Sequence, residues 1–197
     1  MIFVQIASYR DSELIPTIKS CIENAKHPDE LSFGLCVQYG EELDDMYDIM
    51  ELHPNIKSKF IHHSQSKGCS WARSICESLY SGEEFTLQTD SHMRFEKNWD
   101  VDSIELWKYA NDENAIITGY PGIYYKDTPE SEWPVNAPQI CNVYRIASRT
   151  MKQKPEYMTD YSESDMLKKA VSVSGAYIFS KGKVIQDVPH DPELYFS

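Results

Sequence analysis

The tripeptide Asp90-Ser91-His92 is the segment whose residue types and spacing most directly indicate chemistry. It follows the apolar residues 85–89, a pattern that is typical of a buried strand. Residues two apart along an extended segment project to the same side, so the carboxylate and the imidazole can hold one metal ion. This ligand pair suits Mn²⁺ (or Mg²⁺) and leaves positions for phosphate oxygens or water. The structural interpretation is a turn-forming aspartate beside a surface histidine.

Two further segments offer contacts for a nucleotide. In Gly68-Cys69-Ser70-Trp71-Ala72-Arg73 a glycine precedes a predicted helix, whose N-terminus and Arg73 guanidinium can meet a phosphate. Ser8-Tyr9-Arg10-Asp11 ends the first predicted strand and offers hydroxyls, a ring and a charge for a base and ribose, and Gln38 ends the second strand similarly. An ordinary helix start and polar turns are the structural alternatives. His62-His63 is interpreted as a polar strand end, since nothing pairs with it at ligand spacing.

Other motifs with defined chemistry are missing from the sequence. It contains no G-x-G-x-x-G, no G-x-x-x-x-G-K-[ST] and no G-x-S-x-G. Dinucleotide-dependent hydride transfer, P-loop phosphoryl transfer and α/β-hydrolase chemistry are therefore disfavoured.

The charge balance restricts the partners. Thirty-one acidic residues against 19 lysines and arginines give a formal net charge of −12. Such a chain repels a phosphate backbone, so we expect no nucleic-acid partner and a local cation for any anionic ligand. The five cysteines form no C-x-x-C pair, which indicates reduced thiols. The first apolar run is too short for a signal peptide, and none approaches the roughly 18 residues of a membrane span. We expect a cytoplasmic protein without a membrane partner.

The hydropathy pattern predicts an α/β fold. The 197 residues, 41% of them hydrophobic, suffice for one domain with a sizeable core. Predicted strands cover residues 2–7, 31–38, 56–61, 85–89, 115–119, 140–146 and 173–179. Predicted helices cover residues 14–25, with Asp11 or Ser12 as cap, and residues 43–52, 68–80 and 101–107.

This alternation predicts a mostly parallel central sheet flanked by helices, because a helix supplies the crossover between parallel strands. Ligands of such sheets collect beyond the carboxyl ends of the strands. Residues 121–171, rich in Pro, Tyr, Ser and Glu, predict a loop-rich, hairpin-like insertion of the kind that often carries binding.

The sequence resembles the cytoplasmic polypeptide (hydroxyproline-directed) α-N-acetylglucosaminyltransferases and their bacterial and viral relatives. The resemblance begins with Ile-Phe-Val-x-Ile-Ala-Ser-Tyr-Arg-Asp at residues 2–11 and includes Leu-Gln-Thr-Asp-Ser-His-Met-Arg-Phe at residues 87–95. The remaining matching positions, in chain order, are Gln38, Gly68, Ala72-Arg73, Trp99-Asp100, Tyr120-Pro121 and Val188-Pro189-His190-Asp191-Pro192.

The resemblance implies one GT-A-like (Rossmann-like) domain over residues 1–197 that transfers N-acetylglucosamine from a UDP-sugar to an acceptor hydroxyl with retention. It makes Asp90 and His92 the D-x-H ligands of Mn²⁺ (or Mg²⁺), which bridges the diphosphate. The donor contacts that it implies are Ser8, Tyr9, Arg10, Gln38, Gly68, Arg73, Thr89, Asp90, Ser91 and Gly175. Gly175, in the last predicted strand, would let the backbone approach the sugar. Trp99-Asp100 would set the following helix, with Asp100 as its cap.

Members of the family continue into a Gly-Glu-Glu segment, a helix and a later histidine that resembles a third metal ligand. This sequence ends at Ser197, so we expect those groups in a continuation of the chain or in a separate polypeptide, or else a protein that binds without transferring. Without them, metal binding would be looser and acceptor positioning poorer.

Three functions follow as hypotheses. The first is the metal-dependent glycosyltransferase, and the second a catalytically inactive sugar-nucleotide or glycan-binding module. The third is a hydrolase in which Asp90, His92 and His190 hold a metal ion with an activated water. The acceptor stays open between a protein, a glycan and a small molecule, with the loop at residues 120–133 as a candidate surface.

Overall fold

The computed structural model describes residues 1–40, 45–129, 132, 139–147, 150–157, 167–170 and 172–194. Its strands are β1 (Ile2–Tyr9), β2 (Leu31–Tyr39), β3 (Ile56–His62), β4 (Phe85–Thr89), β5 (Ile116–Thr118), β6 (Gln139–Ala147), β7 (Thr150–Tyr157) and β8 (Tyr177–Lys181). Its helices are α1 (Leu14–Asn24), α2 (Asp45–Glu51), α3 (Cys69–Glu77), α4 (Trp99–Tyr109) and α5 (Val184–Asp187). None of the helices in these ranges is both long and apolar enough to cross a membrane.

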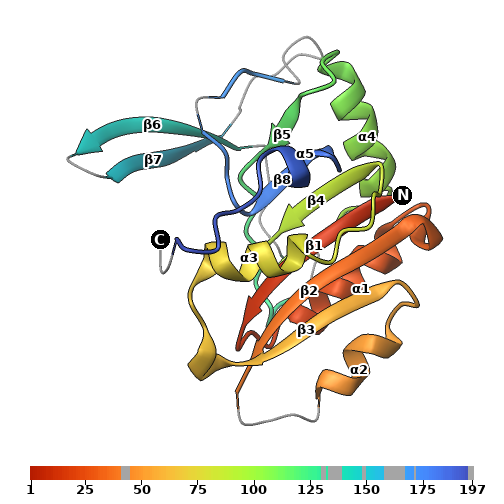
Figure 1. Cartoon of the computed structure of the whole chain (residues 1–197). Coiled ribbons are helices and arrows are strands. Elements are labelled where there is room, and N and C mark those ends of the chain that lie inside the picture. Colours follow the sequence, from red (N-terminus) through yellow and green to blue (C-terminus); the bar gives the residue numbers. More distant parts are fainter. Residues whose placement is uncertain are drawn as a thin grey trace.

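Six of the strands form one sheet in the order β3-β2-β1-β4-β8-β5 (Figure 1). The first four run parallel, and β8 is antiparallel to both β4 and β5. The chain adds β2 and β3 on one side of β1 and then returns to add β4 on the other side. This reversal creates a topological switch point at the carboxyl ends of β1 and β4, where ligands of open α/β sheets bind.

Alternate residues of the central strands face two different helical layers. Val4 and Leu35 belong to the apolar cluster that includes residues of α1 and α4. On the opposite face Cys36 packs against Ala72 and Cys76 of α3. The two faces explain why β1 and β2 are buried along nearly their whole length.

Gly34 in the middle of β2 sets the distance between the sheet and α3. A Cβ at this position would lie 2.9 Å from the carbonyl oxygen of Cys76 and 2.2 Å from the ring of Phe3. Because neither contact is possible for real atoms, the glycine permits α3 to pack this closely. The glycine thereby sets how closely α3 lies against β2.

The predicted strands and helices are confirmed at most positions, with four differences. β8 begins at Tyr177, so Gly175 lies in the turn before this strand and not within it. β7, which pairs with β6 as an antiparallel hairpin, and the short helix α5 were not predicted. The predicted start of the second helix at residues 43–44, and much of the insertion at residues 121–171, lie outside the described residues.

The fourth difference concerns the two predicted helix caps. The residue that caps α1 is Glu13, while Asp11 lies two residues earlier and its carboxylate accepts the Glu13 N–H. Asp100 lies inside α4, and its two oxygens accept the backbone N–H groups of Lys26 and His27 at 2.8 and 2.9 Å. Asp100 therefore joins α4 to the end of α1 instead of capping its own helix.

Candidate functional site

A cavity of about 480 Å³ lies where β1 and β2 end and α3 begins, and we call it the β1–α3 cavity. Its walls include Ala7, Tyr9, Gln38, His63, Gly68 and Cys69. Three of the predicted donor residues, Tyr9, Gln38 and Gly68, are among them. The cavity therefore brings together side chains from three segments that are far apart in the sequence.

Gln38 contributes a buried polar atom without a partner to this cavity. The residue is 4% exposed, and its Nε2 donates to the carbonyl oxygen of Ser8 at 3.2 Å. Its Oε1 has no hydrogen-bond partner among the described residues. An unpaired buried oxygen costs about 1–3 kcal/mol, which a ligand with an N–H or O–H donor would recover. Oε1 of Gln5 is also unpaired, but Gln5 does not line the cavity.

The end of β1 supplies backbone and ring contacts around Gln38. Ser8 is buried, and its carbonyl orients the Gln38 amide. Tyr9 is 53% exposed, and its ring lies edge-on to that of His63 at 6.4 Å. Arg10 has a left-handed backbone with φ of 49° and donates its N–H to the Gln38 carbonyl at 2.8 Å. The guanidinium of Arg10 lies beside Gly40 and does not line the cavity.

The helix α3 presents its N-terminus to the same cavity. Gly68 caps the helix with φ of 105° and ψ of −178°, a backbone that side chains rarely adopt, and provides no side-chain cap. The first backbone N–H groups of a helix have no partner inside the helix. With the positive end of the helix dipole they form a site that suits a phosphate.

One turn further along α3, Arg73 contacts the end of β4. Its Nη2 lies 3.5 Å from Oδ1 of Asp90 and donates to the carbonyl oxygen of Gly175 at 3.0 Å. Nε2 of Gln88 donates to the same carbonyl at 3.0 Å. A Cβ on Gly175 would lie 2.7 Å from the guanidinium nitrogens of Arg73. In this structure the space that the glycine leaves is therefore filled by Arg73, where we had expected a sugar.

The residues that follow β4 are fastened to the start of α1. Ser91 Oγ donates to Asp11 Oδ2 at 2.6 Å, and His92 Nδ1 lies 2.8 Å from the same oxygen. Burial raises the pKa of Asp11, but hydrogen bonds from Ser91, His92 and the Glu13 backbone outweigh it, so that the pKa lies below its ordinary value. Ser91 is 5% exposed and serves to hold this turn. At the end of β4, the Thr89 hydroxyl donates to the carbonyl oxygen of Ala176.

Asp90 and His92 fit a divalent ion by their donor chemistry. Both side chains reach the surface, at 35% and 59% exposure, and they supply one carboxylate and one imidazole. The contact of His92 Nδ1 with Asp11 leaves Nε2 available as a ligand. In the described part of the chain no three His, Cys, Asp or Glu side chains come close enough to form a metal site by themselves.

His190, the third ligand of the hydrolase hypothesis, has another partner. Its Nδ1 lies 2.7 Å from Oε1 of Glu77, and its backbone N–H donates to Oε2 of that residue at 2.9 Å. Asp90 is paired with Arg73, and His92 with Asp11. The described structure does not assemble the predicted triad of Asp90, His92 and His190, so the hydrolase hypothesis loses its ligand set.

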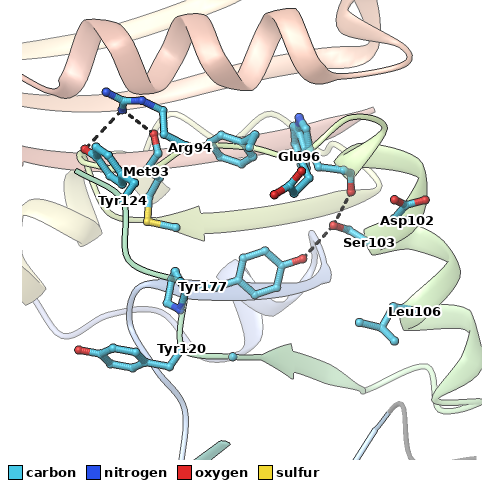
Figure 2. Close-up of a pocket in the computed structure, with 14 residues that line it drawn as sticks. Met93, Arg94, Glu96, Asp102, Ser103, Leu106, Tyr120, Tyr124 and Tyr177 are labelled. Atoms are coloured by element: carbon cyan, nitrogen blue, oxygen red, sulfur yellow. Dashed lines mark hydrogen bonds between the residues drawn. The ribbon is translucent and has the colours of Figure 1, made fainter. Parts of the chain in front are cut away.

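A second cavity of about 450 Å³ begins immediately after His92 (Figure 2). Its walls include five aromatic residues, among them Trp99, Tyr120 and Tyr177. The Tyr177 hydroxyl lies 2.8 Å from Oγ of Ser103. Of the candidate acceptor loop at residues 120–133, positions 130, 131 and 133 lie outside the described residues.

Arg94 forms part of the wall between this cavity and the start of α1. Its Nη2 donates to Oε2 of Glu13 at 2.5 Å, and its guanidinium stacks 4.4 Å from the ring centre of Tyr124. The Arg94 hydrogen bond is the main reason that the pKa of Glu13 lies below its ordinary value. Asp11 and Glu13, at the start of α1, thus bind side chains from the 91–94 segment that leads from β4 into the second cavity.

Two residues at this site have contacts that were not identified from the sequence. Asp11 was predicted as a helix cap and as part of a nucleotide-contacting strand end, but not as the partner of His92, and His63 was interpreted as a polar strand end. A useful signal was available: four acidic or hydroxyl residues, at positions 11–13 and 17, surround the start of the helix that follows the first strand end. Polar residues there could have indicated partners for the Asp90-Ser91-His92 segment.

A family model described as Glycosyltransferase (GlcNAc) matches the chain over residues 1–52 and 46–197. No curated protein sequence matches it. Among solved structures, S. aureus TarS 1–349 matches 100% of this chain with 51% of its own length, at a TM-score of 0.62 and 14% identity. The same protein in complex with UDP-GlcNAc matches 100% of this chain with 48% of its own length, at a TM-score of 0.58 and 15% identity.

GalNAc-T7 with UDP, GalNAc and Mn²⁺ gives a TM-score of 0.69 at 15% identity, over 100% of this chain and 38% of that protein. The chain thus spans about half the length of TarS 1–349 and less of GalNAc-T7. These likenesses show the fold and confirm the predicted GT-A-like, mostly parallel α/β sheet. Because the family model covers the whole sequence, the chain belongs to the Glycosyltransferase (GlcNAc) family.

Proposed function

We propose that this protein transfers N-acetylglucosamine from UDP-N-acetylglucosamine to an acceptor hydroxyl, with a divalent metal ion and with retention of the α configuration. Family membership supports the transferase activity. TarS in complex with UDP-GlcNAc, and GalNAc-T7 with UDP, GalNAc and Mn²⁺, support the donor and the metal. The resemblance to hydroxyproline-directed enzymes supports a polypeptide acceptor, with a glycan or a small molecule as the alternatives.

The unpaired Oε1 of Gln38 is the observation that carries the donor assignment. Uracil presents one ring N–H, at N3, and the amide oxygen of Gln38, a residue that lines the β1–α3 cavity, is a suitable acceptor for it. The rings of Tyr9 and His63, which line the cavity, offer apolar surface to the base. We infer that the cavity holds the uridine of the donor with N3 directed at Gln38.

The diphosphate is expected beside the uridine, at the N-terminus of α3. The N-terminus of α3 begins directly after Gly68, and Arg73 offers a guanidinium that is 19% exposed. In an acidic chain these groups supply the local positive charge that a diphosphate requires. Arg73 can bind phosphate oxygens while its carbonyl contact with Gly175 keeps it in place.

Asp90 and His92 would hold the metal ion through Oδ and Nε2. When bound, the ion would neutralise the charge that develops on the departing diphosphate. Two protein residues orient the donor directly: Gln38 orients the base, and Arg73 orients the phosphates. Retention rests on the resemblance to α-N-acetylglucosaminyltransferases, and NMR of the anomeric proton of the product tests it.

Calorimetric titration of the 197-residue chain with UDP, with and without Mn²⁺, tests the proposal. We expect Mn²⁺ to tighten UDP binding at least tenfold, Asp90→Ala to abolish this gain, and Asp112→Asn to leave it unchanged. Asp112 is a matched control because its carboxylate accepts only the nearby Asn114 N–H in an exposed turn. Equal UDP affinity with and without Mn²⁺ would contradict metal dependence, and absence of UDP binding would contradict the donor site.

An N3-methylated UDP tests the role of Gln38. The methyl group removes the N–H donor, so we expect wild-type affinity for this analogue to fall at least tenfold. Gln38→Leu should bind UDP and the analogue equally weakly. If the wild-type chain binds both nucleotides equally, the base is not recognised through this oxygen.

A sugar-nucleotide-binding module without transferase activity is the second candidate. The observation that favours it is the ion pair of Asp90 with Arg73, which engages one of the two proposed metal ligands. Such a module would pass both binding tests above. Release of UDP from UDP-N-acetylglucosamine, by hydrolysis or by transfer, would exclude it.

A further inference from the structure

We propose that Asp11 is a positioning residue that fixes the tautomer and the ring orientation of His92, so that Nε2 is presented to the metal ion. The inference rests on the proposed metal site. It begins from a carboxylate that uses both oxygens inside the protein. Oδ1 accepts the Glu13 N–H at 2.9 Å, and Oδ2 accepts the Ser91 hydroxyl at 2.6 Å and contacts His92 Nδ1 at 2.8 Å.

The chemistry of this contact decides the tautomer. An ionised carboxylate only accepts hydrogen bonds, so the His92 nitrogen that contacts it must carry the proton. The neutral ring then has its proton on Nδ1 and its lone pair on Nε2. A neutral imidazole in water favours the opposite tautomer, with Nε2 protonated and unable to bind a metal. Asp11 therefore selects the form that is competent as a ligand.

The backbone of His92 is held separately, by Thr17 of α1. This side chain is fully buried, donates to the carbonyl oxygen of Ser91 at 2.8 Å and accepts the N–H of Met93 at 2.9 Å. Thr17 therefore anchors the chain on both sides of His92, in addition to the hydrogen bond from Ser91 to Asp11. The ring itself is 59% exposed, and Asp11 is its described polar contact. Replacing Asp11 should thus release the ring while the turn stays in place.

The groups near the pair divide into those that hold Asp11 and those that shape the surroundings. Ser91 and the Glu13 backbone fix the carboxylate. The Glu13 carboxylate is itself occupied by Arg94, Tyr124 and Lys126. Asp11 is therefore the acidic group that meets the imidazole, and Glu13 serves as a neighbouring carboxylate whose replacement gives a matched control.

Long-range ¹H–¹⁵N correlation NMR of the histidine rings tests the tautomer directly. The metal-free, nucleotide-free chain is measured at pH 8, and His92→Gln identifies the His92 signals. We expect a proton on Nδ1 in the wild type and in Glu13→Gln, and a shift towards the Nε2-protonated form in Asp11→Asn. A wild-type ring protonated on Nε2 overturns the proposal, whether or not any variant folds.

Titration with Mn²⁺, followed by the electron paramagnetic resonance signal of the free ion, tests the consequence. Loss of an orienting partner typically weakens metal binding about 10–100-fold, and we expect this for Asp11→Asn but not for Glu13→Gln. UDP affinity without metal should be unchanged in Asp11→Asn, which shows that the donor cavity is intact. Wild-type Mn²⁺ affinity in Asp11→Asn would overturn the proposal.

The two measurements separate this inference from the proposed function. The tautomer is read without metal, donor or acceptor, so a chain that fails to bind UDP could still show Asp11-dependent protonation of Nδ1. Conversely, Mn²⁺-dependent UDP binding that survives in Asp11→Asn would support the transferase and refute the role of Asp11.

Discussion

The guanidinium of Arg73 lies 3.5 Å from the carboxylate of Asp90, so a cation of α3 occupies one of the two proposed metal ligands. Both groups face the switch point of the sheet, where α3 and the end of β4 approach each other. A metal ion competes with Arg73 for Asp90, whereas a diphosphate is attracted by both positive charges. This ion pair therefore predicts that loss of Arg73 changes the affinities for the metal ion and for the diphosphate in opposite directions.

Replacing Arg73 with Met should strengthen binding of Mn²⁺ alone and weaken binding of UDP. The partly exposed ion pair with Asp90 is worth about 1 kcal/mol or less, so the gain for Mn²⁺ is expected to reach ~5-fold at most. The loss for UDP should reach about tenfold or more, because a charged hydrogen bond to phosphate is removed. Electron paramagnetic resonance and calorimetry measure the two affinities, and a parallel fall of both would refute the competition.

A methyl group on Gly175 should disturb Arg73 without unfolding the protein. In Gly175→Ala the new Cβ meets the guanidinium at 2.7 Å, and the flexible end of the arginine can move away. We expect UDP affinity to fall about 3–10-fold and the free energy of unfolding to change by about 1 kcal/mol or less. Gly119→Ala is the control, since a Cβ there meets no atom within 4 Å. Equal UDP affinities of the two variants would count against this role of Gly175.

The fold was largely predictable because its signals are local. β1, β2 and β4 are apolar runs, and α1 carries its apolar residues at helical spacing, so hydropathy locates them within about two residues. Hydropathy did not predict β7, because its sequence, TMKQKPEY, has few apolar residues and contains a proline. It pairs with the preceding strand β6, and apolar periodicity does not report such a pairing.

The candidate site was predictable only in part, for a related reason. Strand ends and a helix start can be recognised locally, which is how Gln38, Gly68 and Asp90 were found. The partner of each side chain depends on how the segments meet in space. Asp11 and His92 are 81 positions apart, and the polar residues at positions 11–13 and 17 do not by themselves specify which of them His92 contacts.

Gly34→Ala should destabilise the protein strongly. The added methyl group would lie 2.9 Å from the backbone of α3 and 2.2 Å from Phe3, and backbone cannot move aside as a side-chain end can. Overpacking of this kind costs about 1–3 kcal/mol. Urea unfolding measures the loss, again against Gly119→Ala. A variant as stable as the wild type would show that α3 can shift outward without penalty.

Glu13→Gln should lower stability in a pH-dependent way. The Arg94 hydrogen bond lowers the pKa of Glu13 from 4.5, so its contribution is complete above pH 4.5 and is lost as the pH falls through the folded-state pKa. We expect the variant to be less stable by about 1–2 kcal/mol at pH 7 and the difference to shrink below pH 4.5. Urea unfolding at several pH values measures it, and a constant difference would contradict the ion pair.

Burial makes most of the described thiols unreactive, and this has a practical consequence. It raises the pKa of Cys36 to about 12, and it raises the pKa of Cys21 and Cys76 as well. Cys69, at the first position of α3, is the exposed thiol among these four and lines the β1–α3 cavity. A fluorophore attached there would lie at the β1–α3 cavity, so the chain already carries an attachment point for an optical sensor of the proposed nucleotide binding.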